Sequence, residues 1–327
     1  MDRRTFIGSV AGGLLAVPIA ARAQKSAIPV IGLLVPAGVG ENSYVMVALR
    51  RGLSETGYVD GKNVAIEFRR AEGRYDQLPA LAADLVSRHV AILVTFGGSV
   101  SARAAKAATS TIPIVFVGVF DPVGAGLVES LGRPGGNLTG VSVLSASLAA
   151  KRVELLHEMI PKATVIALLV NPDNPGAGSS ARNSQEATRS LGLQLHVLRA
   201  RSEQDFDAAF ATLVQLRVGA LVVMGDIFLS SRGKLIAGLA VRHAVPTMFE
   251  ARDSVAAGGL MSYGANLSET YRQVGIYTGT ILNGAKPADL PVLQPTTFDL
   301  VINRRTAKAL GLTIPRSLLV RANEVIE

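Results

Sequence analysis

The chain has 327 residues, with 33 basic and 25 acidic side chains, a formal charge of +8 and no cysteine. The absence of cysteine excludes a disulfide framework, a thiolate metal site and a lipid-modified cysteine, so we expect no lipid anchor. The basic side chains are scattered, and their longest runs are pairs such as Arg69-Arg70 and Arg304-Arg305. A nucleic-acid groove needs basic residues interleaved with aromatic ones, so we expect no nucleic-acid partner.

The first 23 residues have the three parts of an export signal. Arg3 and Arg4 form a basic start, Ile7 to Ala20 an apolar middle, and Ala21-Arg22-Ala23 an A-x-A cleavage site. The adjacent arginines and the modest hydrophobicity favour a twin-arginine signal, cleaved near Ala23, which predicts a location in the periplasm. The alternative is a membrane anchor, but the apolar segment is shorter than the roughly 20 residues needed to cross a bilayer.

After the signal, apolar segments of strand length alternate with amphipathic helical patterns, such as those at 77–87 and 151–160. This alternation is typical of parallel sheets covered by helices. Most of the segments are apolar throughout, as expected for strands buried on both faces, whereas 64–68 alternates with polar residues and is predicted to form an edge. The predicted strands are 30–35, 64–68, 91–95, 114–117, 165–170, 194–198, 220–224 and 247–249.

Three segments of the first half recur in the same order in the second half. Three ordered pairs predict two similar lobes rather than one large sheet, each a doubly wound parallel α/β sheet, joined by a hinge. The pairs are VIGLLVP at 30–36 with VIALLVN at 165–171, HVAILVTFGG at 89–98 with RVGALVVMGD at 217–226, and IPIVF at 112–116 with VPTMF at 245–249.

The length of the chain after the signal also favours two domains, because about 300 residues exceed the usual size of a single core. Hinge residues are expected where the chain changes lobe, near 142–147, 263–267 and 294–297. Gly264 fits either a hinge or a turn. The N-terminal lobe is predicted to comprise 28–143 and about 264–293, and the C-terminal lobe 144–263 and about 294–327.

Parallel sheets bind ligands beyond the carboxyl ends of their strands, where helix N-termini offer unpaired N–H groups. In the first lobe, Gly97, Gly98 and Ser99 follow a predicted strand and open a helix, so their amides and the serine hydroxyl suit a ligand carboxylate. Ser99 is equally consistent with a helix N-cap. Phe120 and Asp121 follow the next strand, where Asp121 fits either a ligand contact or a turn.

The corresponding strand ends of the second lobe carry Asn171, Asp226 and Glu250. Amides on one lobe and acids on the other suit a zwitterion, with its carboxylate on the first lobe and its ammonium on the second. Either acid could instead cap a helix or lie on the surface. The residues assigned to an apolar pocket for the ligand side chain, each of which also suits a core position, are Tyr44, Phe96, Met224, Phe228 and Tyr263.

Four segments are specific enough to indicate a family. They are LPALAADLV at 78–86, AAKAATSTIPIVFV at 104–117, DPVGAGLVESLGRPGGNLTGVS at 121–142 and AKPADLPVLQPTTFDLVINRRTAKALGLTIPRSLLVRANEVIE at 285–327. These segments closely resemble the substrate-binding proteins of bacterial ABC importers, in the uncharacterised-transporter group of the type I periplasmic binding fold, related to tryptophan-binding members. The resemblance spans nearly the whole chain after the signal and does not identify the ligand.

The resemblance implies a monomeric protein that captures a small molecule between its lobes and delivers it unchanged to the permease of an ABC transporter, which works with an ATPase subunit. In amino-acid-binding relatives, amides and hydroxyls at helix starts of the first lobe bind the ligand carboxylate, and an acid of the second lobe binds the ammonium. By strand position, Gly98 and Ser99 match the first role, and Glu250 or Asp226 matches the second. No cofactor or metal is implied.

Two other functions fit the sequence less specifically. A ligand-sensing protein of the same fold would deliver its ligand to a membrane receptor instead of a permease. A serine hydrolase would need a G-x-S-x-G elbow, but GGSVS at 97–101 has Ser101 in place of the last glycine. It would also need a histidine on a loop after a strand, a position that none of the four histidines occupies in the predicted elements. We therefore expect a binding protein and no enzyme.

Overall fold

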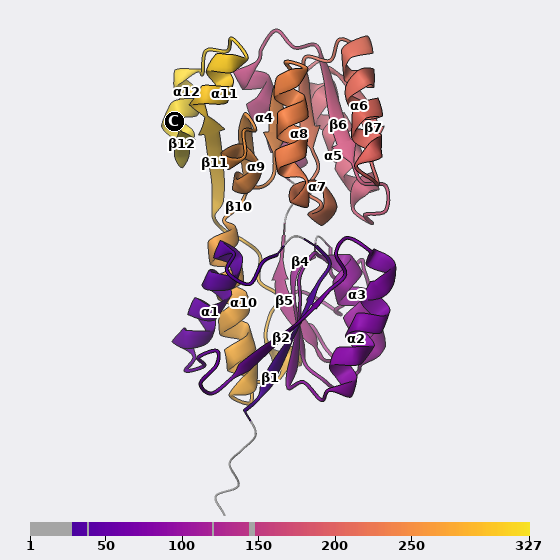
Figure 1. Cartoon of the computed structure of the whole chain (residues 1–327), viewed down its shortest axis with the longest axis vertical. Helices are drawn as coiled ribbons and strands as arrows, with labels where there is room; N and C mark the ends of the chain where they lie inside the picture. The colour runs from indigo at the N-terminus through magenta and orange to yellow at the C-terminus, as the bar shows by residue number, and fades with distance from the viewer. Residues whose placement is uncertain (1–27, 38, 120, 144–147) are drawn as a thin grey trace, which may run out of the picture.

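The structure is a computed structural model that describes residues 28–37, 39–119, 121–143 and 148–327. Figure 1 shows two α/β lobes stacked along the long axis of the molecule. The predicted export signal at 1–23 and the predicted ligand contact Phe120 lie outside the described residues. Within those ranges, no helix is both long and apolar enough to span a membrane.

The first lobe is a parallel sheet with helices on both faces. Its strands are β1 (Val30–Val35), β2 (Ala65–Arg70), β3 (Ile92–Thr95), β4 (Ile114–Val119) and β5 (Leu138–Ser142), and its helices are α1 (Tyr44–Glu55), α2 (Leu78–Ser87), α3 (Ser99–Ala108) and α10 (Leu267–Leu282). The strand order is β2-β1-β3-β4-β5, with every neighbouring pair parallel. Strand β2 lies at an edge, as the alternating sequence predicts.

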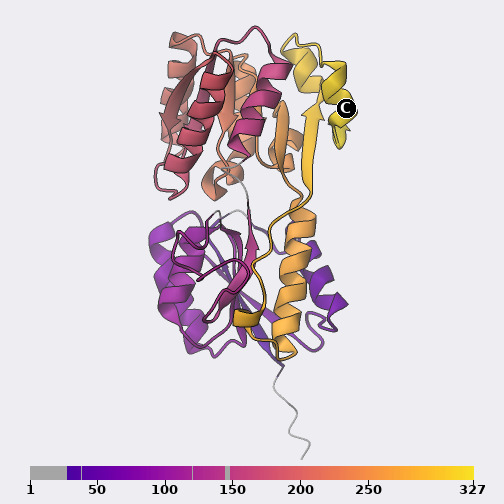
Figure 2. The same cartoon turned by 180° about the vertical axis from the view of Figure 1, so that it is seen from behind.

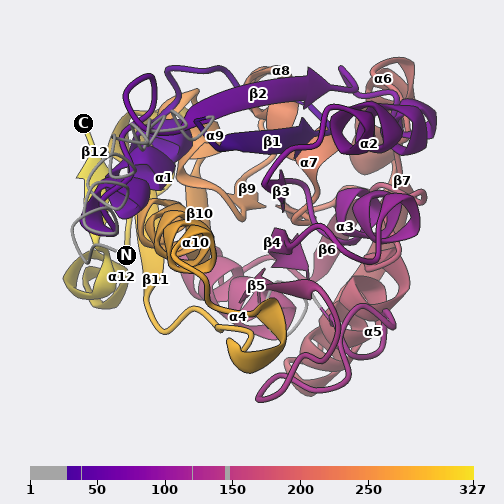
Figure 3. The ribbon, with the colours of Figure 1, turned by 90° about the horizontal axis from the view of Figure 1, so that it is seen from below.

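Adjacent residues of β1 point to opposite faces of this sheet. Leu33 packs in the core beneath α1 and α10, and Leu34 packs in the core beneath α2 and α3. Figure 3 shows these two helix pairs on opposite sides of the sheet. The apolar sequence of the strand therefore reflects burial on both faces.

The second lobe repeats this arrangement and adds two strands. Its strands are β6 (Val165–Val170), β7 (Gln194–Arg199), β8 (Ala220–Val223), β9 (Thr247–Phe249), β10 (Met261–Ala265), β11 (Phe298–Asn303) and β12 (Glu324–Ile326). Its helices are α4 (Ala149–Met159), α5 (Ala177–Ser190), α6 (Gln204–Gln215), α7 (Ile227–Ser231), α8 (Gly233–Arg242), α9 (Arg252–Ala256), α11 (Arg304–Ala309) and α12 (Arg316–Arg321). The order is β7-β6-β8-β9-β10-β11-β12, with only the β10–β11 pair antiparallel among the described strands.

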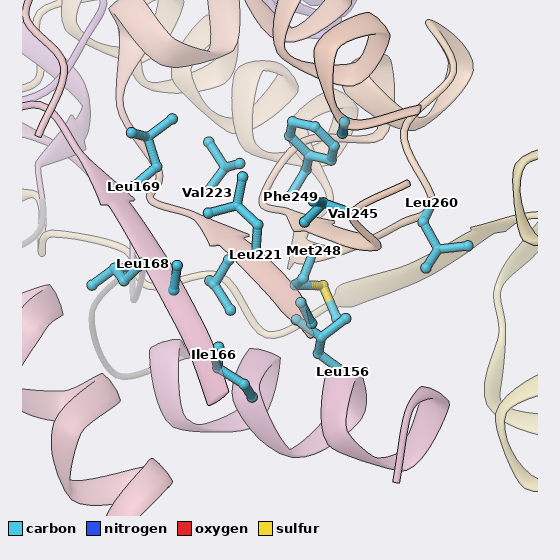
Figure 4. Packing of buried hydrophobic residues seen from close by; sticks show 14 of the residues in the cluster. Leu156, Ile166, Leu168, Leu169, Leu221, Val223, Val245, Met248, Phe249 and Leu260 are labelled. Carbon is cyan, nitrogen blue, oxygen red and sulfur yellow. The ribbon is translucent and has the colours of Figure 1, made fainter. Parts of the chain in front are cut away.

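The internal repeat is visible in the topology, because β7-β6-β8-β9-β10 has the same order as β2-β1-β3-β4-β5. The predicted fold class, two doubly wound parallel lobes, is confirmed. The core of the second lobe forms where side chains of α4 meet those of β6, β8 and β9, as Figure 4 shows for Leu156, Ile166, Leu221 and Met248.

The chain passes between the lobes at three places, after β5, after β10 and before β11. The second change of lobe follows Ala265, because β10 continues through Gly264 in the second sheet. A hydrogen bond from the Asn266 N–H to the Thr297 carbonyl, 3.1 Å, joins the second and third passages. Before the third passage, Leu293 lies along β5 and bonds to the Gly140 carbonyl at 2.9 Å.

Helix α10 returns to the first lobe and packs closely on α1. Glycines make this approach possible: a Cβ on Gly52 would lie 2.0 Å from the Arg272 carbonyl oxygen, and a Cβ on Gly275 would lie 2.2 Å from that of Leu49. The first lobe therefore depends on a helix that follows most of the second lobe in the sequence.

Candidate functional site

A cavity of about 480 Å³ lies between the two lobes at the carboxyl ends of the strands. Loops after β1, β3 and β4 form the first-lobe wall, and loops after β6, β8 and β9 form the second-lobe wall. Doubly wound sheets bind ligands at such a location. The volume falls within the range of small-molecule sites, about 300–1,000 Å³.

The turn from β3 into α3 supplies part of the first-lobe wall. Gly97 and Gly98 have positive φ angles of 80° and 77°, so a side chain at either position would strain the backbone. Gly98 is the N-cap and Ser99 the first helical residue, which corrects the alternative interpretation of Ser99 as a cap. Gly98 lines the cavity, but its N–H already donates to the Val117 carbonyl at 3.2 Å, which the predicted role as a carboxylate donor does not include.

Other donors remain at this wall. The first-turn N–H groups of an α-helix have no partner inside the helix, and Ser99 and Val100 of α3 both line the cavity. Arg103 lines it as well and is missed by the sequence analysis. Its spacing of four residues from Ser99, which puts both on one helix face, is the signal that could have found it. Asp121 also lines the cavity, while its carboxylate accepts the Gly124 N–H at 2.8 Å and shapes the turn.

On the second-lobe wall, Asp226 is a nearly buried carboxylate, 6% exposed. It caps α7 by accepting the Leu229 N–H at 3.0 Å, and it accepts the side-chain amides of Asn174 at 2.8 Å and Asn171 at 3.3 Å. The pKa of Asp226 is raised, because the effect of burial exceeds the opposing effect of these uncharged donors. Asn171 is not in the cavity wall and contributes indirectly, because its side-chain amide donates to the Asp226 carboxylate.

Glu250, which follows β9 in the same wall, has a different environment. Its Oε1 lies 3.4 Å from Nη2 of Arg152, a residue of α4 that is 2% exposed. The Arg152 Nε donates to the Tyr263 carbonyl of β10 at 2.7 Å. The predicted ammonium acceptor Glu250 is therefore already paired with a buried cation that the sequence analysis misses.

Two tyrosines of the first lobe reach the second lobe, Tyr44 in the cavity wall and Tyr75 outside it. Burial raises the pKa of the Tyr44 hydroxyl, and the nearby negative charge of Asp253 at the start of α9 raises it further. The hydroxyl of Tyr75, in the short helix η1 (Tyr75–Gln77), is buried beside Phe228 and the charge of Asp226. The lobes therefore touch each other through polar groups next to the cavity.

The structure places only part of the predicted apolar pocket in the cavity wall. Tyr44 and Met224 line it. Phe96 does not: it is fully buried in the core, with its ring edge-on to Tyr271 at a centroid distance of 4.8 Å. Tyr271 of α10 lines the cavity instead, and no local pattern marks it because Phe96 lies 175 residues earlier in the chain.

The other two predicted aromatics also pack elsewhere. Phe228 stacks on Phe206 of α6 at a centroid distance of 5.8 Å, and Tyr263 packs against Phe298 of β11 at 6.2 Å. Their rings fill gaps between elements of the second lobe, which explains why neither borders the cavity. Across the described ranges, no group of three His, Cys, Asp or Glu side chains is arranged to hold a metal ion.

Two similar lobes, three passages between them and a cavity at the facing strand ends define a bilobal ligand-binding protein. The chain matches the family described as ABC transporter substrate binding protein over residues 43–326, and it belongs to this family. Like its relatives, it is a binding protein and not an enzyme.

Three relatives illustrate the similarity. A tyrosine-binding protein of Clostridioides difficile is 28% identical over 80% of this chain and 75% of its own. The ABC domain of a Streptococcus pneumonia protein in complex with L-Trp has a TM-score of 0.83 and 28% identity, with 91% of this chain and 99% of that chain covered. The ligand-free, open structure of a Clostridium difficile substrate-binding protein with adhesive properties has a TM-score of 0.67 at 25% identity, with the same coverage.

Proposed function

We propose that the protein captures an amino acid, or a zwitterion of similar size, in the interlobe cavity. The contrast between the two walls carries this proposal. The first turn of α3 offers unpaired N–H groups, and Asp226 offers a carboxylate whose recorded hydrogen-bond donors are all uncharged. A ligand carboxylate and a ligand ammonium would each gain charge-assisted hydrogen bonds there. The tyrosine-binding and L-Trp-bound relatives support a ligand of this class.

Asp226 is a better acceptor for the ammonium than Glu250. A buried ion is stable only when it is paired and hydrogen-bonded. Glu250 already has the guanidinium of Arg152, whereas amide donors orient the Asp226 carboxylate without supplying a positive charge. The ammonium of the ligand would supply that charge.

We further propose that the protein works in the periplasm and delivers its ligand to an ABC permease as a closed, liganded form. Family membership supports the link to a transporter. The approach of Tyr44 to Asp253 and of Tyr75 to Phe228, each from the first lobe to the second, supports closure of the lobes around the ligand. A ligand drives closure only through contacts with both lobes at once.

Ligand binding is tested by a thermal-shift screen of the amino acids, nucleosides and sugars, followed by titration calorimetry of each hit. A ligand at 100 times its Kd should raise the free energy of unfolding by about 2.7 kcal/mol. Asp226→Asn should weaken binding of an amino-acid hit by about 2–5 kcal/mol, because it removes the partner of a buried charge. Asp207→Asn, at an exposed position of α6, is the control. Stabilisation by uncharged sugars alone would contradict the proposal.

Export is tested with the full-length chain in a bacterial host that has a twin-arginine pathway. Replacing Arg3 and Arg4 together by lysine should leave the uncleaved precursor in the cytoplasm, because this route reads the arginine pair. The measurement is an immunoblot of periplasmic and cytoplasmic fractions. Equal export of the wild type and the double variant would exclude the twin-arginine route.

A further inference from the structure

The buried residue Arg152 connects the ligand cavity to two of the three passages between the lobes. It lies in the first turn of α4, the helix that follows the first passage. Its Nε donates to the carbonyl of Tyr263, three residues before the second passage at Asn266. Its Nη2 reaches Glu250 of the cavity wall at 3.4 Å.

The backbone around this group is closely packed. A Cβ on Gly264 would lie 2.4 Å from the carbonyl oxygen of Glu250 and 3.1 Å from its Cγ. The glycine therefore lets β10 lie directly against the residue that carries the cavity carboxylate. A side chain at position 264 would collide with Glu250.

The charge of Arg152 requires a partner at this depth. Burial lowers the pKa of the guanidinium, and the Glu250 carboxylate opposes that shift. Removing one member of a buried ion pair leaves the other uncompensated, which costs much more than the pair contributes. Glu250, whose side chain is 21% exposed on the cavity side, is thus the carboxylate whose charge Arg152 balances.

We propose that Arg152 is a positioning residue that neutralises the charge of Glu250. The cavity therefore favours amino acids with uncharged side chains over amino acids with cationic side chains. This inference rests on the proposed function. A ligand with a second ammonium, such as lysine, needs a second acid whose charge is not balanced, and Asp253 of the same wall lies close to the charge of Arg252. Because Glu250 is paired with Arg152, its charge is not available to bind a second ammonium of the ligand.

The test compares the Kd values of phenylalanine, tyrosine, leucine and lysine, measured by calorimetry on the full mature protein and three variants. Arg152→Met should raise the affinity for lysine relative to the best neutral amino acid by roughly tenfold or more, since it removes the guanidinium that lies beside Glu250. Arg152→Met with Glu250→Gln should return that ratio to the wild-type value. Arg152→Lys should keep the wild-type ratio, because it keeps the positive charge.

A purely structural role for Arg152 would lower all affinities together and leave the ratio unchanged, which would overturn the inference. If Arg152→Met does not fold, Glu250→Gln alone decides. It leaves the buried Arg152 cation behind the cavity wall without the Glu250 charge and should shift selectivity from lysine toward glutamate by a similar factor; an unchanged ratio rejects the inference. Failure of the wild type to bind any amino acid contradicts the proposed function itself, a result distinct from altered selectivity.

Discussion

Asp226 and Glu250 occupy equivalent places in the sequence pattern, each after a buried strand, yet their surroundings differ. Asp226 accepts from two asparagines and a backbone N–H, and Glu250 lies beside a buried arginine. The alternation of strands and loops is enough to predict where the two acids lie. It cannot predict their partners, because Arg152 lies 98 residues before Glu250 in the chain.

The raised pKa of Asp226 predicts that a fall in pH has two opposite effects. It should stabilise the free protein and reduce the stabilisation that the ligand adds. Burial makes the folded protein protonate Asp226 at a higher pH than the unfolded chain does. The contribution of Asp226 to the free energy of unfolding therefore increases as the pH falls through the range between the two pKa values. Binding of an ammonium needs the charged carboxylate, so the ligand-induced rise in Tm should shrink over the same range.

Thermal melts with and without ligand, between about pH 7.5 and about pH 4 near the ordinary carboxyl range, measure this effect. Glu250 and Asp253 face the same cavity, and burial also raises the pKa of Asp253. Asp226→Asn is therefore the necessary comparison. Its residual ligand-induced shift should depend on pH less than that of the wild type, and an equal dependence would assign the effect to another acid.

Helix α1 acts at both of its ends. Its first residue, Tyr44, lies in the cavity wall close to the charge of Asp253 on the other lobe, and Gly52, near its other end, allows the close approach of α10. Neither role can be predicted from the local sequence, since both depend on segments more than 200 residues away. Helix α1 thus contributes both to the approach of the two lobes at the cavity and to the stability of the first lobe.

Tyr44→Phe should weaken ligand binding by about 0.5–1.5 kcal/mol, the usual size of one polar contact, because it removes a hydroxyl that lies close to Asp253 only when the lobes are together. Calorimetry measures the affinity, and urea unfolding without ligand should give nearly the wild-type midpoint. Tyr58→Phe is the matched control. It removes a hydroxyl that bonds to Asn283 at 3.1 Å within the first lobe and should leave the affinity unchanged.

Gly52→Ala should destabilise the fold by about 1–3 kcal/mol or more, because the new methyl group would overlap the Arg272 carbonyl. Gly238→Ala tests the same substitution in α8, at an exposed position with no atom within 4 Å of the added Cβ. It should stabilise by about 0.4–1 kcal/mol. Denaturant unfolding of both variants measures the difference, and similar losses in both would show that contact with α10 is not the cause.

At the scale of the whole molecule, the two lobes follow from the internal repeat, but several strands do not. Strands β5 and β10 escape prediction because Gly140, Thr139, Ser262 and Gly264 interrupt their apolar character. The glycines are required by packing: a Cβ on Gly140 would lie 2.1 Å from the Phe116 carbonyl oxygen. Their identity as strands depends on neighbours in the folded sheet and not on local propensity.

Ligand should change the relative position of the lobes. The arrangement of the two lobes matches the L-Trp-bound relative more closely than the ligand-free, open one, with TM-scores of 0.83 and 0.67. Small-angle X-ray scattering should therefore give a larger radius of gyration for the free protein than for the saturated protein. Tyr44→Phe should need more ligand to reach the compact value. An identical radius with and without ligand would mean that capture does not require closure.

The late return of α10 to the first lobe has a consequence for biosynthesis. The core beneath α1 includes Tyr271, Val274 and Ile281, and Leu293 lies along β5. On the ribosome, nearly nine-tenths of the polypeptide must emerge before these side chains can cover the earlier half. The nascent chain therefore carries an unfinished apolar face for most of its translation, and both halves reach their final form almost together.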